Sequence, residues 1–181
     1  MAGIAFVNYL LVCIAAFSGL WAGALLAFIS PEEMKAGRKY FELLVRALFV
    51  LASVPSALYF SRDGYILPSL LVALCILFMF CPWHDGKHIY RRYRFAYLLL
   101  GFFFYIPYLS SAYLSSGGSA ISPALFPAAA SLIFITGLPE GSLFAYEHEG
   151  MKRTRILRKI FICHSAFFIN IPLYFLTTSL F

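Results

Sequence analysis

Three polar stretches separate long apolar runs, and the central one, residues 81–94, holds the side chains best suited to chemistry. It contains Cys81, His84 and His88 in a Cys-x2-His-x3-His spacing. Thiolate sulfur and imidazole nitrogen are ligands that zinc prefers. His148, flanked by two glutamates in another polar stretch, could supply a fourth ligand. Zinc binding by these four residues is one hypothesis, and solvated loop side chains are the other. No other cofactor is predicted.

Polar side chains inside the apolar runs are the candidates for a transport path, because ionisable groups at membrane depth are costly and usually functional. His164 titrates near neutral pH and could couple a proton, or it could lie at a wet interface. Asn170 precedes a proline and could bind a substrate or an opened backbone, or it could simply pack. Glu140 follows Pro139 and could coordinate a cation or proton, or it could be a surface acid at a helix end.

The composition excludes an ordinary soluble domain. Of the 181 residues, 62% are hydrophobic and 12% are charged, whereas soluble domains carry about 25% charged residues. A soluble chain of this length could not bury so much apolar surface. The solvent of most side chains is therefore expected to be lipid, and the chain is expected to be an integral membrane protein without a separate soluble domain.

The apolar runs predict an all-α, multi-pass transmembrane bundle, because a helical span needs about 20 apolar residues. Some runs are interrupted by proline, so broken or re-entrant helices are an alternative for individual spans. Six runs qualify, and they give predicted spans at residues 3–29, 41–60, 65–81, 95–114, 121–138 and 160–181.

The cations indicate how the chain is threaded. All but one of the 14 Lys and Arg residues lie in residues 30–46, 82–94 and 139–159, and the exception is Arg62. Cations in short loops resist translocation, so these three stretches are predicted to be cytoplasmic. Both termini are then predicted on the non-cytoplasmic side, which requires an even number of spans.

Juxtamembrane cations attract anionic lipid headgroups. Nucleic acid is not an expected partner, because the basic residues lie within a few positions of apolar spans. The residues predicted to contact headgroups are Arg91, Arg92, Arg94, Lys152, Arg153, Arg155, Arg158 and Lys159.

Small residues recur every four positions along the first span, at Ala15, Gly19, Gly23 and Ala27. Such a face lets another helix backbone approach closely. The partner could be another span of the same chain or, alternatively, a second copy or another membrane subunit.

The function favoured by these features is a small transporter-like or channel-like bundle for a small solute or ion. The alternative is a non-catalytic subunit or assembly partner of a larger membrane complex. A third hypothesis is a membrane enzyme that uses the cytoplasmic histidine, glutamate and cysteine residues. An enzyme is disfavoured, because no catalytic triad order, phosphate-binding glycine loop or paired intramembrane carboxylates stand out, and no catalytic residue is assigned.

Overall fold

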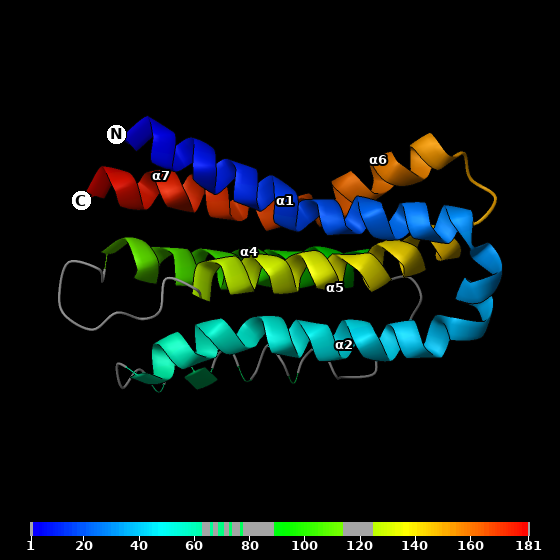
Figure 1. Ribbon diagram of the computed structural model, residues 1–181, viewed down its shortest axis with the longest axis horizontal. Helices are drawn as coiled ribbons and strands as arrows, with labels where there is room; N and C mark the ends of the chain where they lie inside the picture. The colour runs from blue at the N-terminus through cyan, green and yellow to red at the C-terminus, as the bar shows by residue number, and fades with distance from the viewer. Residues whose placement is uncertain are drawn as a thin grey trace. The chain divides into compact units, whose positions relative to one another are not determined.

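The fold is that of a computed structural model, which describes residues 2–62, 66, 69–70, 73, 77, 89–113 and 125–180. These residues are helical almost throughout and contain no strand, which confirms the predicted all-α class. Figure 1 labels the α-helices along the chain. They are α1 (Ala2–Ile29), α2 (Pro31–Arg62), α4 (Ile89–Tyr113), α5 (Leu125–Glu147), α6 (Arg153–His164) and α7 (Asn170–Leu180), and the 3-10 helix η3 (Ser165–Ile169) lies between α6 and α7.

Three helical segments within the described ranges are long and apolar enough to cross a membrane: Phe6–Ile29, Phe126–Glu147 and Arg153–Thr177. A fourth apolar segment, Arg94–Tyr108, is shorter. Together with the composition, they indicate a membrane-embedded protein. Six spans, a non-cytoplasmic location of both termini and cytoplasmic basic loops stay predictions, and the predicted span at residues 65–81 lies mostly outside the described residues.

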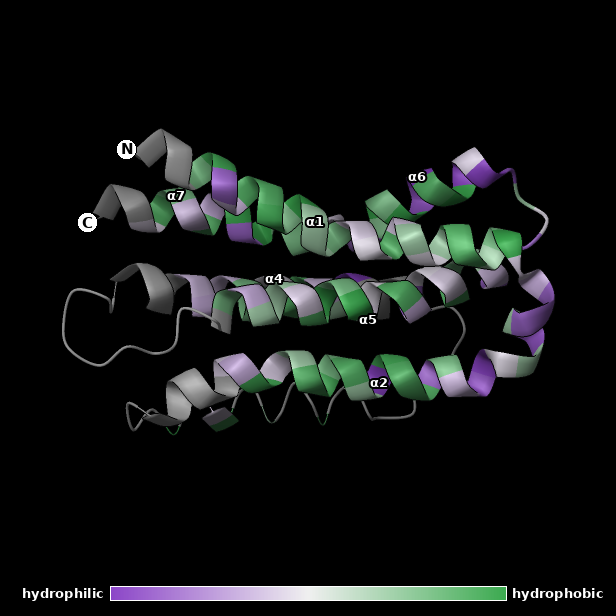
Figure 2. Ribbon diagram, in the orientation of Figure 1, coloured by the Kyte–Doolittle hydropathy of each residue, from purple (hydrophilic) through white to green (hydrophobic). Residues whose placement is uncertain are grey.

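Helix α2 begins at Pro31, whereas the sequence predicts a span from residue 41. Proline fits the first helical position, because its fixed φ suits the helix and its missing N–H would have no partner there. Glu32 and Glu33 in the first turn interact favourably with the positive end of the helix dipole. The helix therefore extends into polar sequence, visible as the purple first turns of α2 in Figure 2.

Helix α5 continues to Glu147, whereas the sequence predicts that the span ends at Leu138. Pro139 lies inside the helix and removes one backbone hydrogen bond, which costs about 3 kcal/mol in an isolated helix. The stretch around it is packed tightly against α1 through Gly137 and Gly141. Tertiary packing contributes more to helix stability than local propensity does.

The described chain divides into two compact units. The first consists of Met1–Leu48 and Ala130–Cys163, and the second of Phe49–Ala129 and His164–Phe181. Helices α2 and α5 therefore contribute to both units.

In the first unit, α1 and α5 approach each other through glycines. A Cβ atom added at Gly23 would lie 2.0 Å from the Leu138 carbonyl oxygen, and one added at Gly141 would lie 2.0 Å from the Leu20 carbonyl oxygen. Gly19 lies equally close to the α5 backbone, where its added Cβ would be 2.1 Å from the Phe134 oxygen. Only glycine tolerates such contacts, and their gain is close van der Waals packing of the two backbones.

The predicted small-residue face of α1 is thus occupied inside the chain over most of its length. Gly19, Gly23 and Ala27 are buried, while Ala15 is exposed. The Ser142 hydroxyl of α5 lies 2.7 Å from the Gly23 carbonyl oxygen and can donate a hydrogen bond to it. This bond adds a polar contact at the same crossing.

In the second unit, the core is aromatic. Phe103 and Phe104 of α4 are buried and make edge-to-face contacts with Phe49 and Phe167, respectively. Such ring pairs contribute about 0.5–1.5 kcal/mol beyond the area that they bury. The Ser56 hydroxyl of α2 donates to the Phe103 carbonyl oxygen at 3.1 Å, which ties this part of α2 to α4.

We predict that Gly23→Ala and Gly141→Ala each lower the stability of the protein by about 1–3 kcal/mol, because the added methyl group forces the two backbones apart. The measurement is thermal or denaturant unfolding of the purified protein in detergent or bicelles.

The matched control is Gly37→Ala in α2. An added Cβ there meets only the Phe41 ring, at 3.1 Å, which can shift. Since alanine is the better helix former, this variant should be neutral or slightly stabilised. Equal stability of Gly23→Ala and Gly37→Ala would contradict the packing described for α1 and α5.

Candidate functional site

The segment Arg153–Thr177, one of the three candidate spans, is broken in its middle. Helix α6 ends at His164, five residues form the 3-10 helix η3, and α7 begins at Asn170. Both flanking residues are fully buried, each with 0% of its surface exposed. A stretch of 3-10 helix inside a longer helix often marks a functional hinge, because its hydrogen bonds are poorer than those of an α-helix.

The break has a local cause in the sequence. Pro172 lacks an N–H, so it cannot bond to the Phe168 carbonyl, and its ring disfavours α-helical geometry just before it. At the same break the Asn170 side chain bonds to the backbone of η3, because its Nδ2 donates to the Phe167 carbonyl oxygen at 2.7 Å. The carboxamide of Asn170 thus binds a backbone carbonyl group of η3.

One face of α4 packs along this broken helix. It presents Tyr97, Gly101 and Tyr105, which are spaced four residues apart and therefore lie on the same side. The Tyr97 ring meets the His164 ring edge-on at a centroid distance of 4.6 Å. At Gly101 an added Cβ would lie 2.5 Å from the Phe167 carbonyl oxygen, so α4 lies directly against η3.

The third residue of that face contacts α7. The Tyr105 hydroxyl donates to the Leu173 carbonyl oxygen at 3.1 Å and also lies against the Thr177 hydroxyl. Within a membrane, leaving such groups unpaired would be costly. This face of α4 therefore contacts the His164 imidazole at one end and the Thr177 hydroxyl group at the other.

An imidazole and a carboxamide, set six positions apart in an apolar span, are groups that can exchange a proton or hydrogen-bond a small polar solute. The structure places His164 and Asn170 at the two ends of η3, in one unit. Sequence reasoning singled out both residues but missed Tyr97, Gly101 and Tyr105. Their spacing on one helix face was the available signal.

Glu140, the third predicted transport-path residue, belongs to the first unit, whereas His164 and Asn170 belong to the second. The sequence left open a surface acid at a helix end. Instead, Glu140 lies inside α5 with 4% of its surface exposed. A carboxylate in such a position is costly and requires interactions within the protein.

The structure also places His148, the fourth hypothetical zinc ligand. Its ring stacks on Phe144 at a centroid distance of 4.4 Å, and its Nδ1 lies 2.8 Å from the Phe144 carbonyl oxygen. It therefore interacts with one of the terminal carbonyl groups of α5, a common role near helix ends. Cys81, His84 and His88 lie outside the described residues. Among the residues that are described, no three His, Cys, Asp or Glu side chains gather to hold a metal ion.

Of the residues predicted to contact lipid headgroups, those at the start of α6 are exposed, namely Lys152, Arg153, Arg155 and Arg158, while Lys159 is half-buried. The Arg153 guanidinium lies over the Phe28 ring at 5.4 Å, a cation–π arrangement. Arg94 of α4 is exposed. The side chains of Arg91 and Arg92 lie outside the described part.

One ion pair links the first turns of α2 to the end of α5. Arg38 Nε donates to Glu42 Oε1 at 2.9 Å, and its guanidinium lies 3.9 Å from Glu147 Oε1. The hydrogen bond to Glu42 raises the pKa of the Arg38 guanidinium. Arginine is already protonated throughout the physiological pH range, so the raised pKa adds no pH dependence to this ion pair there.

We predict that Asn170→Ala loosens the break, because the Phe167 carbonyl oxygen then loses its side-chain donor. The expected cost is about 0.5–1.5 kcal/mol, the net contribution of one intramolecular hydrogen bond. The measurement is thermal unfolding combined with amide hydrogen exchange of residues 165–170. The control is Asn8→Ala in α1, where the asparagine is exposed and no comparable cost is expected. Unchanged exchange in Asn170→Ala would contradict the role assigned to this bond.

Comparisons of the chain with protein-family models, with curated proteins and with solved structures gave no match, so its function must be inferred from its own residues.

Proposed function

We propose that this membrane protein is a small transporter-like or channel-like bundle for a small solute or ion. The observation that supports it is the break in the C-terminal candidate span, with His164 and Asn170 buried at its two ends. Discontinuous helices of this kind form the binding sites of many transporters, because the unwound backbone offers polar groups at membrane depth.

The chemistry of the break is consistent with such a site. In η3 the Phe167 carbonyl oxygen accepts a hydrogen bond from the Asn170 side chain. A solute that carries a hydrogen-bond donor could replace the Asn170 side chain at this oxygen. His164 adds an imidazole, whose ring nitrogens can donate or accept a hydrogen bond. Tyr97 packs edge-on against it from α4. A solute that competes for these groups would be held in the middle of the span.

The short 3-10 helix is the part of this span that rearranges at the lowest cost, because its hydrogen bonds are poorer than those of the flanking α-helices. The 3-10 helix is short, and its weak hydrogen bonds can convert to α-helical ones through small changes in ψ. Gly101 gives the η3 backbone room to lie directly against α4. The proposed working unit is therefore His164, η3 and the start of α7, which pack against the face of α4 within the second unit.

A transport path must be wet, and this is testable by cysteine labelling. The four native cysteines, Cys13, Cys75, Cys81 and Cys163, are replaced by alanine, and Asn170→Cys is introduced in liposomes. A small, charged, water-soluble thiol reagent reacts only with a thiol that water reaches. We expect modification of Asn170→Cys, although residue 170 is fully buried within the chain.

The matched control is Phe175→Cys, in the same helix α7, because Phe175 is 53% exposed and would face lipid in a membrane. It should react at least about tenfold more slowly, because a thiolate is strongly disfavoured in hydrocarbon. Ala166→Cys, half-buried in η3, provides a second position if Asn170→Cys does not fold. A lack of reaction at both positions, from either side of the membrane, would overturn the proposed path.

A further inference from the structure

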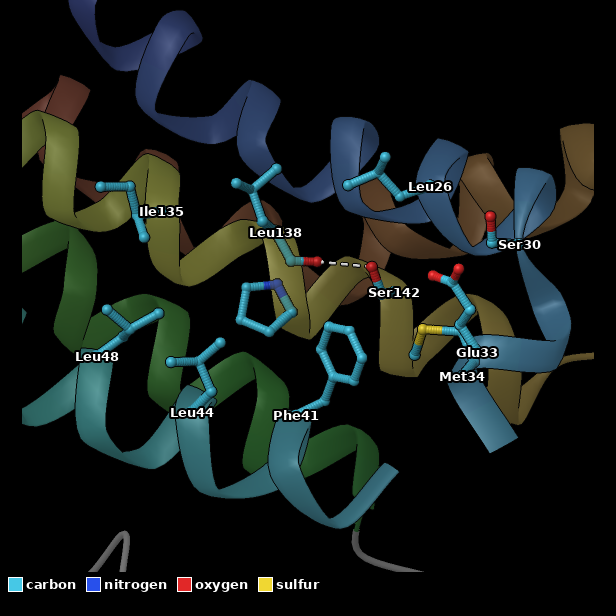
Figure 3. Close-up of a pocket in the computed structure, with 11 residues that line it drawn as sticks. Leu26, Ser30, Glu33, Met34, Phe41, Leu44, Leu48, Ile135, Leu138 and Ser142 are labelled. Atoms are coloured by element: carbon cyan, nitrogen blue, oxygen red, sulfur yellow. Dashed lines mark hydrogen bonds between the residues drawn. The ribbon is translucent and has the colours of Figure 1, made fainter. Parts of the chain in front are cut away.

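The first unit contains a pocket of about 300 Å³ that the transport proposal does not use. It lies among the end of α1, the first half of α2 and the middle of α5 (Figure 3). Its volume is at the lower end of the range of about 300–1,000 Å³ found for small-molecule sites. Because all of its lining residues belong to one unit, the pocket is complete without the other unit.

The two ends of the pocket differ in chemistry. Figure 3 shows Ser30 and Glu33 at one end, and Leu48 and Ile135 at the other. Leucine, phenylalanine, methionine and proline side chains form most of the wall along its length. A site with this pattern fits a molecule with a polar head and an apolar tail.

The carboxylate at the polar end is available for a ligand. Ser30-Pro31-Glu32-Glu33 has the pattern of a capping box, in which the glutamate side chain would bind the backbone N–H of the serine. Here the Ser30 N–H donates instead to the Leu26 carbonyl oxygen at 3.0 Å, as the last hydrogen bond of α1. Glu33 is exposed and forms no hydrogen bond or ion pair with any residue in the described ranges.

The charged residues near the polar end of the pocket do not neutralise the Glu33 carboxylate. Arg38, the cation that forms ion pairs in this region, is bound by Glu42 at 2.9 Å and lies 3.9 Å from Glu147. Lys35 and Glu32 are both exposed on the first turns of α2 and do not line the pocket. Glu33 is therefore the charge that a polar head in the pocket would meet.

The depth of the two ends agrees with this polarity. The candidate span of α1 ends at Ile29, so Ser30 and Glu33 follow directly after it. In a membrane, these two residues would lie near the headgroups. Ile135 and Leu138 lie within the candidate span of α5, at hydrocarbon level. The tail of a lipid-like molecule could therefore enter from the bilayer while its head stayed at the interface.

We propose that this pocket binds a single-chain amphiphile with a protonated amine head, such as a long-chain amine. The alkyl tail lies along the wall toward Leu48 and Ile135, and the ammonium group contacts the Glu33 carboxylate. A carboxylate or phosphate head is disfavoured, because it would meet Glu33 as a like charge. The tail exchanges lipid for the apolar wall, so it gains close van der Waals packing rather than removal from water, while the acid selects the head.

The experiment uses the full chain in nanodiscs of zwitterionic lipid. Dodecylamine that carries a diazirine at the tail end is photolysed, and the modified residues are located by mass spectrometry. We expect modification at the apolar end of the pocket, at Leu44, Leu48 or Ile135. Unlabelled dodecylamine, dodecanol and dodecanoic acid then compete, and the amine should be about fivefold more potent than the alcohol.

Variants test whether the ammonium head group contacts Glu33. Glu33→Gln should reduce the potency of dodecylamine to that of dodecanol, whereas its neighbour Glu32→Gln, which does not line the pocket, should leave the preference intact. Ile135→Trp should abolish pocket labelling by filling the apolar end. Ile135 is 43% exposed, so the larger side chain can be accommodated without disrupting a packed core.

Three outcomes would overturn the proposal. Labelling spread evenly over lipid-facing residues would indicate simple partitioning into the bilayer. Equal potency of the three head groups on the unmodified protein would show that Glu33 does not select the ligand. Equal effects of Glu33→Gln and Glu32→Gln would assign the preference to the general charge of the first turn of α2. None of these results depends on whether the break at η3 conducts a solute.

Discussion

The close backbone approach of α1 and α5 is the contact on which the first unit depends. Between helices in lipid, apolar side chains gain little by leaving a solvent that is itself apolar, so association relies on close packing and polar contacts. Gly19, Gly23 and Gly141 remove the side chains that would hold the two backbones apart, and Ser142 adds a hydrogen bond at the crossing. This packing also explains why α5 remains helical through Pro139, and Pro139 in turn forms part of the pocket wall.

In the second unit, close approach of the helices depends on different residues. There, α4 combines one glycine with two tyrosines on a single face, so that the backbone of η3 packs at Gly101 while the tyrosines meet His164 and α7. Aromatic side chains supply most of the remaining core. Pro172 disfavours a regular helix here, and the Asn170 side chain bonds to the η3 backbone at Phe167. The break is therefore held in place, although its 3-10 hydrogen bonds are weaker than those of the helices around it.

The two proposals assign different roles to the two units. In the second unit, buried polar groups at a broken span are suited to a small solute or an ion, which requires water at membrane depth. In the first unit, an apolar pocket with an acid at its interfacial end is suited to a molecule drawn from the bilayer itself. In both, the specificity comes from a small number of polar groups in an apolar setting, where each uncompensated charge or hydrogen bond matters most.

The sequence by itself determined the class of protein and its helical fold, because hydrophobic composition and the requirement for internal backbone hydrogen bonds in lipid permit few alternatives. It also identified His164, Asn170, Gly19 and Gly23 as unusual residues within apolar runs. The extent of the helices was decided by tertiary packing. Pro139 is a helix breaker in isolation, yet the glycine-mediated contact with α1 holds it inside α5.

Tertiary structure alone also decided which side chains meet. Tyr97 and His164 are 67 positions apart in the chain, and no local pattern links them. Likewise, Glu33 lies at one end of a pocket whose walls come from α1, α2 and α5, and the contribution of α5 is about 100 positions away in the chain. Local sequence governs propensity and periodicity over a few turns, whereas these contacts depend on how distant helices pack.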